Sequence, residues 1–298
     1  MKRPQGVGLY APSGFALDPA AVDRAATRLT AMWESVTVDP TCRTRLQRFA
    51  ASDDERLAAV LRMANDPAVD LAIALRGGYG WTRLLRRLDF RALAAARKQW
   101  LGYSDFTAFQ LAALAHAGMV TFAGPVVSDF GATQPSAFTF DRCFGLLDQP
   151  RYEVSCDLDG PDVVCSGTLW GGNLAMVAHL CGTPHFPQID GGILFLEDVG
   201  ETPYRIERML YQLHHAGVLA RQRAILLGQF TEYALSPNDG GYDVAAAVAH
   251  MRGVCAAPIF TGLPFGHVPD KLTLPVGGRL DLLVRGGAAT LAFSGYVD

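Results

Sequence analysis

The sequence has little charge and no clear excess of either sign. Charged residues make up 18% of its 298 residues, and 26 basic against 29 acidic side chains give a formal net charge of −3. A nucleic-acid-binding protein needs a basic surface for the phosphate backbone, so this balance argues against nucleic acid as a partner. With 50% hydrophobic residues, the composition is that of a well-buried globular chain and argues against disorder.

Long hydrophobic runs and paired cysteines are also missing. The longest apolar-rich tract, Leu111–Val127, is broken by two glycines and a proline, which predicts a buried helix followed by a strand rather than a membrane span. The basic start, Met1–Pro4, resembles that of a signal peptide, but the apolar stretch Val7–Ala11 is too short for one. None of the six cysteines forms a C-x-x-C pair, so we expect reduced thiols in a cytoplasmic protein with no membrane segment.

The first half of the sequence alternates strand-like and helix-like segments. Apolar strands are expected at Val7–Ala11, Val69–Leu75 and Trp100–Tyr103. Helices are expected at Pro19–Trp33, Asp53–Ala64, Trp81–Leu88 and Thr107–Ala117. This repetition of strand, loop and helix predicts a mostly parallel sheet with helices on both faces.

The second half follows a stretch with weak periodicity and several prolines. Its expected strands are Val163–Thr168, Gly192–Leu196, Ala224–Gln229 and Ile259–Leu263, with a terminal hairpin of Arg279–Val284 and Ala289–Phe293. Its expected helices are Tyr204–Ala216 and Tyr242–Met251. The prediction is an α/β protein with an N-terminal domain at residues 1–135, a connector with the edge of a second domain at 136–162, and a C-terminal domain at 163–298.

A serine stands where a short strand runs directly into a helix, in Gly102-Tyr103-Ser104-Asp105-Phe106-Thr107. Such a turn exposes the serine hydroxyl at the carboxyl edge of a sheet, and the next backbone N–H can stabilise an oxyanion. The usual motif is G-x-S-x-G, and Phe106 departs from it. The alternative is that Ser104 only caps the helix.

Glycine is abundant: 31 of the 298 residues, roughly a tenth of the chain, are glycine, against a usual share of ~7%. Several fall in Arg76-Gly77-Gly78-Tyr79-Gly80, at the end of an expected strand, where glycines let backbone N–H groups approach an anion. The segment is neither G-x-G-x-x-G nor a P-loop, so no nucleotide site is predicted. A tight strand-to-helix turn is the alternative.

Two further segments could complete a nucleophilic site. The apolar strand Ile193–Asp198 delivers carboxylates at its carboxyl end, among them Glu197, which could orient a histidine or simply cap the next helix. His267 lies in the Gly/Pro-rich loop Leu263–Pro269, a better place for a general base than the helical segments that hold most other histidines. A serine hydrolase needs a serine, a histidine and a carboxylate in any chain order, so Ser104 can act with these two.

Six segments, taken in order, resemble the motifs of the LD-carboxypeptidase family, serine peptidases also called muramoyltetrapeptide carboxypeptidases. They are Ala11-Pro12-Ser13-Gly14, Arg76–Gly80, Gly102–Asp105 with Thr107, Leu169-Trp170-Gly171-Gly172-Asn173-Leu174, Leu196–Glu201 with Tyr204-Arg205, and Gly266-His267 followed by Thr273–Gly277. The resemblance implies a Rossmann-like, amidotransferase-like N-terminal α/β domain and a mixed β/α C-terminal domain with the site between them. It implies a cytoplasmic homodimer that needs no cofactor or metal.

The resemblance also implies a substrate and residue roles. The family cleaves the bond between the L-centre of a diamino acid and a terminal D-alanine in murein tetrapeptides, during peptidoglycan recycling. By motif, Ser104 is the nucleophile, His267 the base and Glu197 its orienting carboxylate. The backbone N–H groups of Asp105 and of Gly77 or Gly78 are expected to form the oxyanion hole.

Substrate contacts are less defined. We expect Arg76, beside the glycine loop, to hold the terminal carboxylate of the peptide, because a guanidinium forks onto a carboxylate. Trp170 and Asn173 are predicted to form walls of the substrate site. Glu201 lies in the same motif as Glu197, so either carboxylate could face His267.

Two other functions fit the same sequence. Some relatives of the family cleave acylated nucleotide (microcin-type) antibiotics for self-immunity, and Trp170 or Tyr242 could stack on a nucleobase. A non-catalytic muropeptide sensor could use the same two-domain frame. A general α/β-hydrolase is disfavoured because no His-Gly-Gly-Gly segment is present.

Overall fold

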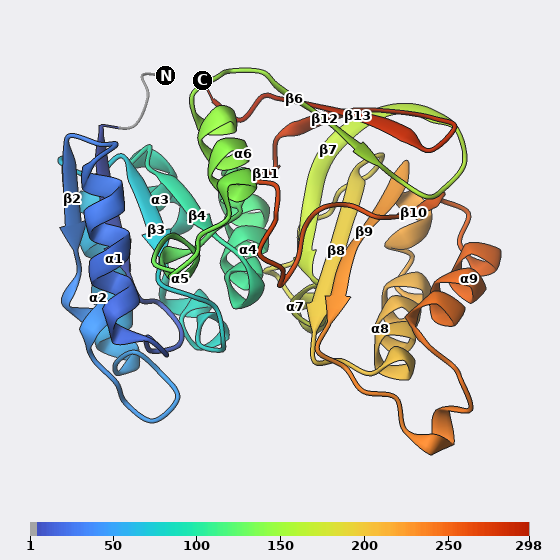
Figure 1. Cartoon of the computed structure of the whole chain (residues 1–298), viewed down its shortest axis with the longest axis horizontal. Coiled ribbons are helices and arrows are strands. Elements are labelled where there is room, and N and C mark those ends of the chain that lie inside the picture. The colour runs from blue at the N-terminus through green and yellow to red at the C-terminus, as the bar shows by residue number, and fades with distance from the viewer. Residues whose placement is uncertain (1–4, 298) are drawn as a thin grey trace.

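The computed structural model describes residues 5–297, which form two β-sheets with helices packed against them (Figure 1). The basic start of the chain, Met1–Pro4, lies outside the described residues. No helix in the described range is long and apolar enough to cross a membrane.

The N-terminal sheet is mostly parallel. Its strands stand in the order β11-β5-β4-β3-β1-β2. They are β1 (Gly6–Tyr10), β2 (Ser35–Val38), β3 (Leu71–Ala74), β4 (Gln99–Gly102), β5 (Thr121–Ala123) and β11 (Leu274–Val276). Neighbouring strands are parallel, except that β11 runs antiparallel to β5.

Helices cover both faces of this sheet, as predicted. The first group packs with Val7 and Leu9 and consists of α1 (Pro19–Thr30), α5 (Val127–Phe130) and α6 (Ala137–Leu147). The second packs with Tyr10 and consists of α2 (Asp53–Asn65), α3 (Phe90–Ala95) and α4 (Thr107–Ala117). The two groups separate because successive side chains of a strand point to opposite faces.

The C-terminal sheet is mixed. Its strands stand in the order β10-β9-β8-β7-β12-β13-β6. They are β6 (Tyr152–Asp157), β7 (Val163–Asn173), β8 (Ile193–Val199), β9 (Ala224–Thr231), β10 (Ile259–Thr261), β12 (Arg279–Arg285) and β13 (Ala288–Ser294). From β7 to β10 the neighbours are parallel, and the other pairs are antiparallel. The associated helices are α7 (Leu174–Leu180), α8 (Pro203–His215) and α9 (Val244–Val254).

Two segments differ from the prediction. The basic helix expected at Trp81–Leu88 is a pair of 3-10 turns, Trp81–Arg83 and Leu85–Arg87. At its start, the backbone N–H of Trp81 donates to the carboxylate of Asp105, which is distant in sequence. The stretch 136–162, expected to be a connector with the edge of a second domain, contains β6, the edge strand of the second sheet, but also an unexpected helix, α6. The sequence did not predict α6, whose position depends on contacts with residues far away in sequence. The Phe144 ring of this helix, for example, lies 4.8 Å from the Trp33 ring, centre to centre.

The two halves of the molecule are closely joined. Strand β11 lies in the C-terminal part of the sequence yet extends the N-terminal sheet. Each of the two buried apolar clusters includes side chains from both sheets: Val7 with Phe195 in one, and Tyr10 with Leu194 in the other. The domain boundaries at residues 135 and 163 therefore stay a prediction, and β11 crosses them.

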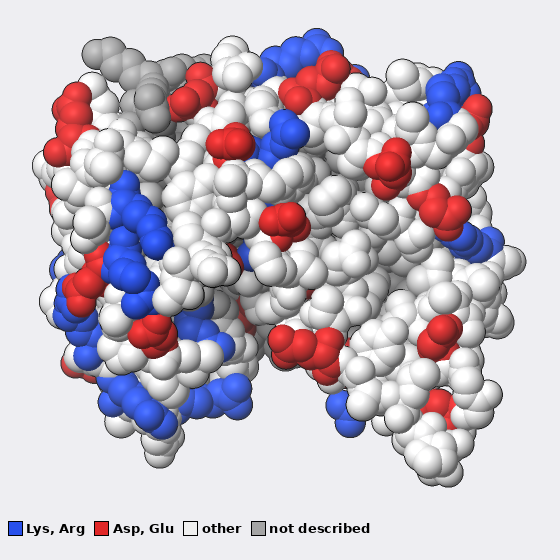
Figure 2. Space-filling view, viewed as in Figure 1, with Lys and Arg blue, Asp and Glu red and all other residues white. Residues whose placement is uncertain are grey.

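Parallel strands place their carboxyl ends at a common edge, where sites usually form. In Figure 1 the arrows of β2, β8 and β9 point toward the bottom of the view. Figure 2 shows that the surface is hollowed between the two halves on this lower side, with basic side chains over the N-terminal half and acidic ones beside the hollow.

Candidate active site

Ser104 occupies a strained turn between β4 and α4. Its φ of +65° is a left-handed conformation that L-residues with a side chain seldom adopt. The turn is tight on its other side too, since a Cβ on Gly102 would lie 2.7 Å from the ring of Phe106. Phe106 thus stands where the usual motif has glycine, and Gly102 makes room for it. The strain is that of a nucleophile elbow.

His267 connects Ser104 with Glu197. Its Nε2 lies 3.0 Å from Ser104 Oγ, and its Nδ1 lies 2.7 Å from Glu197 Oε2. The Glu197 side chain is fully buried and that of His267 is 19% exposed, so the imidazole joins a buried carboxylate to a more accessible hydroxyl. Of the two carboxylates left open by the sequence, the structure brings Glu197 to His267, whereas Glu201 lies 3.6 Å from Arg205.

Asn173 holds the carboxylates at the end of β8. The parallel register pairs Asn173 of β7 with Glu197, and its Nδ2 donates to Glu197 Oε1 at 3.3 Å and to Asp198 Oδ1 at 2.9 Å. Its Oδ1 accepts from the N–H of Met176, which caps α7. The buried side chain is thus a partner of the carboxylates, which differs from its predicted place on the wall of the substrate site.

Asp198 binds the start of α7. Its carboxylate accepts from the N–H groups of Ala175 and Val199, both at 2.8 Å. Burial, with a contribution from the neighbouring charge of Glu197, raises the pKa of Asp198 to about 6.

The prediction that Trp170 lines the substrate site is wrong. Trp170 is fully buried, and its Nε1 donates to Gln222 Oε1 at 2.9 Å. Its ring packs edge-on against Phe186 within the core that includes α7 and α8. Alternate residues of β7 face opposite sides of the sheet, and the position of Trp170 sends its ring to the helical side.

The glycine loop lies against the nucleophile. A Cβ on Gly77 would stand 2.7 Å from Ser104 Oγ and 3.2 Å from the backbone nitrogen of Asp105. Gly78 has a φ of +107° and lies next to Gly14. The structure therefore brings the glycine loop close to Ser104 and to the backbone nitrogen of Asp105.

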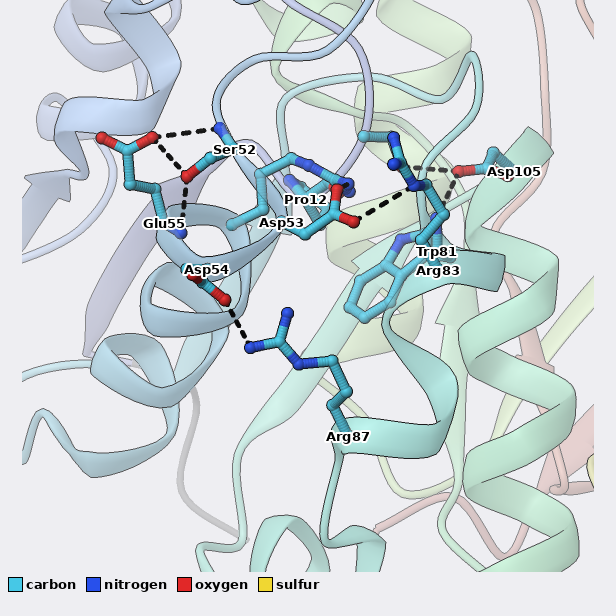
Figure 3. A network of polar contacts seen from close by, with 11 residues as sticks. Pro12, Ser52, Asp53, Asp54, Glu55, Trp81, Arg83, Arg87 and Asp105 are labelled. Carbon is cyan, nitrogen blue, oxygen red and sulfur yellow. Dashed lines mark hydrogen bonds and ion pairs between the residues drawn. The ribbon is translucent and has the colours of Figure 1, made fainter.

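The side chain of Asp105 fastens this loop. It is buried, and its Oδ2 accepts from Ser13 Oγ at 2.6 Å and from the N–H of Trp81 at 3.1 Å. Figure 3 shows Asp105 pointing toward the backbone of Trp81, close to the ion pair of Asp53 with Arg83. Burial raises the pKa of Asp105. The sequence singled out only its backbone N–H, because a contact with residues 24 and 92 positions away leaves no local signal.

Arg76 has a free guanidinium near the loop. Across residues 5–297, no carboxylate lies within ion-pair distance of it, and burial lowers its pKa. Arg76 lines a cavity of about 320 Å³ together with Leu75, Ser128 and Thr133. An unpaired, half-buried cation is suited to bind an anion brought by a substrate.

The described residues contain no group of three or more His, Cys, Asp or Glu side chains that could hold a metal ion. Independently of that, hydrogen-bond contacts connect the candidate nucleophile Ser104, the imidazole of His267 and the carboxylate of Glu197.

The chain is similar to known proteins over most of its length. Sequence models of the LD-carboxypeptidase N-terminal domain and the LD-carboxypeptidase C-terminal domain match residues 7–124 and 166–282. The murein tetrapeptide carboxypeptidase of Pseudomonas aeruginosa is 33% identical over 250 residues, which cover 78% of this chain and 78% of that protein. The probable murein peptide carboxypeptidase of Bacillus subtilis is 29% identical over 278 residues, which cover 92% of this chain and 87% of the relative.

Solved structures are similar to this chain over almost its full length. The muramoyltetrapeptide carboxypeptidase from Oxalobacter formigenes has a TM-score of 0.91 and 45% identity, covering 98% of this chain and 100% of its own. The microcin C7 self immunity protein MccF, in complex with aspartyl sulfamoyl adenosine, has a TM-score of 0.90 at 21% identity, over 100% of this chain and 99% of its own. The likeness to MccF is one of fold alone.

A strained serine within hydrogen-bond distance of a histidine, which in turn contacts a buried carboxylate, is the arrangement typical of serine hydrolases. The two matching domain models and the relatives above show which one: the chain belongs to the LD-carboxypeptidase family.

Proposed function

We propose that this enzyme removes the terminal D-alanine from murein tetrapeptides, by cleaving the bond that follows an L-configured diamino acid. The observation that carries the proposal is the hydrogen-bonded chain from Glu197 through His267 to Ser104, beside the glycine loop. The names of the relatives from Pseudomonas aeruginosa and Oxalobacter formigenes support the substrate class. The proposed setting is peptidoglycan recycling in the cytoplasm, by a homodimer.

In the proposed mechanism, Ser104 Oγ attacks the carbonyl carbon of the scissile bond while His267 Nε2 takes its proton. The imidazolium that forms is stabilised by Glu197 at Nδ1. His267 then returns the proton to the amine of the leaving D-alanine, and water hydrolyses the acyl-enzyme by the same route. Acid–base help of this kind contributes roughly 10²–10⁴-fold.

The glycine loop supplies the oxyanion hole in this proposal. The N–H groups of Asp105 and of Gly77 or Gly78 donate to the oxygen that becomes negative in the tetrahedral intermediate. Each such donor is worth roughly 10²–10³-fold in kcat. The bonds from Ser13 and Trp81 to the Asp105 carboxylate keep the loop in place before substrate arrives.

Arg76 is proposed to bind the terminal carboxylate. A carboxypeptidase must recognise that group, and the guanidinium lacks a carboxylate partner within residues 5–297. A charge-assisted, bidentate contact selects a chain end over an internal peptide bond.

The second candidate function, cleavage of acylated nucleotide antibiotics, has weaker support. Of the two aromatic residues suggested for stacking, Trp170 is in the core, whereas Tyr242 is half-buried and its hydroxyl donates to Glu207. Purified enzyme should be incubated separately with L-Ala-γ-D-Glu-meso-diaminopimelate-D-Ala and with an aspartyl sulfamoyl adenosine, and the products weighed by mass spectrometry. We expect loss of alanine from the peptide and an intact nucleoside; the reverse result would replace the proposal by the second candidate.

A muropeptide sensor without catalysis is the third possibility. Reaction of Ser104 with a fluorophosphonate separates it from an enzyme, because covalent labelling needs an activated hydroxyl. An unlabelled protein that binds the tetrapeptide without cleaving it would favour the sensor.

A further inference from the structure

The two halves of the catalytic pair reach the site from different parts of the fold. Ser104 follows β4 of the N-terminal sheet, and His267 lies on the loop after β10 of the C-terminal sheet. The hydrogen bond between them spans 3.0 Å and is therefore sensitive to any sliding of this loop. Something must set the position of the histidine loop, residues 264–273, relative to the N-terminal half.

The distal end of the histidine loop is docked on α6. Thr139 Oγ1 donates to the carbonyl of Pro269 at 2.7 Å and accepts from the N–H of Lys271 at 2.9 Å. Ser136 Oγ donates to Asp270 Oδ1. The two ends of the loop are joined to each other, since the N–H of Leu272 donates to the carbonyl of Pro264. Residues 269–271 of the loop are therefore attached to the N-terminal half by hydrogen bonds to Ser136 and Thr139.

Lys271, in the same part of the loop, carries a buried charge that is paired with the N-terminal half. Its side chain is 1% exposed, and its Nζ donates to Asp129 Oδ1 at 2.8 Å. Asp129 is itself fixed, because its Oδ2 accepts from the N–H of Val126 at the start of α5. Only the lysine is buried, since the Asp129 side chain is 24% exposed. The Lys271 ammonium without its carboxylate would be an unpaired charge away from water, which is strongly unfavourable. The pair therefore defines one position for the loop.

Tyr103 links this ion pair to the catalytic histidine. The Lys271 Nζ lies 4.8 Å from the centre of the Tyr103 ring, a cation–π distance. The same ring lies 5.0 Å from the imidazole of His267, centre to centre. Tyr103 immediately precedes Ser104. Its ring therefore lies between the ammonium of Lys271 and the imidazole of His267 in a chain of contacts, next to the nucleophile.

We infer that Lys271 is a positioning residue: its ion pair with Asp129 and its contact with Tyr103 hold His267 in the register in which Nε2 reaches Ser104. It touches no reacting atom. The inference rests on the proposed function only for the substrate assay. Its signature is a loss of turnover without a loss of substrate binding, because the Lys271 ammonium contacts Asp129 and Tyr103 rather than Arg76 or the glycine loop.

The test compares Lys271→Met, which keeps the length of the side chain and removes its charge, with Lys98→Met. Lys98 is a matched control, since its ammonium binds the backbone carbonyls of Asp66 and Val69 rather than a carboxylate. For Lys271→Met we expect kcat for D-alanine release to fall roughly 10- to 100-fold with KM changed less than about twofold, because a misplacement near 1 Å costs about 10²-fold. Lys98→Met should keep both constants close to wild type.

A folding defect is separated from misalignment by a double variant. Lys271→Met with Asp129→Asn removes both charges of the pair and keeps an oxygen that can accept from the N–H of Val126. The thermal midpoint should therefore recover relative to Lys271→Met while kcat stays low. If kcat recovers together with the midpoint, the pair only stabilises the fold and the inference is wrong. A folded Lys271→Met protein with wild-type kcat, or one altered in KM alone, overturns it as well.

The rate of Ser104 labelling by a fluorophosphonate gives a readout that needs no peptide substrate. It should fall in Lys271→Met by a factor similar to that in kcat. Equal labelling of wild type and variant refutes the positioning role alone, whereas a wild type that is labelled but releases no D-alanine refutes the proposed substrate alone. A wild type that is not labelled refutes both.

Discussion

Gly77→Ala places a methyl group directly against the nucleophile. The new Cβ would lie 2.6 Å from Ser104 Cβ and 2.7 Å from Ser104 Oγ, against an ordinary contact distance of 3.4–4 Å. The φ of Gly77 is not in the left-handed region, so alanine fits the backbone and the clash is the only new feature. Relief requires Ser104 or the loop to move by about 0.8 Å.

A displacement of that size should reduce catalysis strongly. Misplacement near 1 Å costs about 10²-fold, and withdrawal of one oxyanion donor costs roughly 10²–10³-fold. We therefore expect kcat/KM for D-alanine release to fall by about 10²-fold or more. The rate of Ser104 labelling by a fluorophosphonate should fall with it.

Gly253→Ala is the matched control for this substitution. A Cβ at Gly253 meets nothing within 4 Å, and the residue lies in α9, where alanine stabilises a helix by about 0.5–1 kcal/mol. Its activity should equal that of the wild type. Wild-type kcat/KM in Gly77→Ala would refute the close approach of the glycine loop to Ser104.

Two further predictions concern charge. Arg76→Ala should raise KM for the tetrapeptide about 10- to 100-fold with little change in kcat, because it removes a charge-assisted contact worth about 1.5–3 kcal/mol; steady-state kinetics check this, and an unchanged KM contradicts the carboxylate role. Asp198→Asn tests pH dependence: the folded-state pKa is raised to about 6 from an unfolded value near 3.9, so the folded protein binds this proton more tightly and wild-type stability falls as pH rises from about 4 to about 6. Relative to Asp198→Asn, the wild type should lose about 2 kcal/mol of stability between pH 4.5 and pH 7, measured by urea unfolding at those two pH values. A constant difference between the two proteins would contradict the shift.

Periodic segments of the sequence were predictable because local chemistry decides them. Helix α4 has the predicted bounds, Thr107–Ala117, and ends at Gly118 in a left-handed conformation. Helix α2 begins at the acidic run as expected, and the structure adds the reciprocal capping of Ser52 and Glu55. Resemblance to a known family, supported by six motifs, supplied the pairing of Ser104 with a histidine and a carboxylate far away in sequence.

Features that depend on contacts across the fold were not predictable in the same way. Asn173 looked like a substrate contact because no pattern reveals that β7 and β8 place it beside Glu197. Trp170 looked available because which face of β7 turns inward is set by the helices that cover it. Lys271 gave no signal at all, since its partner Asp129 lies 142 residues away.

The most direct test of the account is the release of D-alanine from L-Ala-γ-D-Glu-meso-diaminopimelate-D-Ala by the wild type and by Ser104→Ala. The hydroxyl that the variant removes is the atom bonded to His267, and the rest of the site is untouched. The account predicts stoichiometric D-alanine from the wild type and a rate lower by several orders of magnitude in the variant. Equal rates in the two proteins, or no release by a folded wild type, would contradict it.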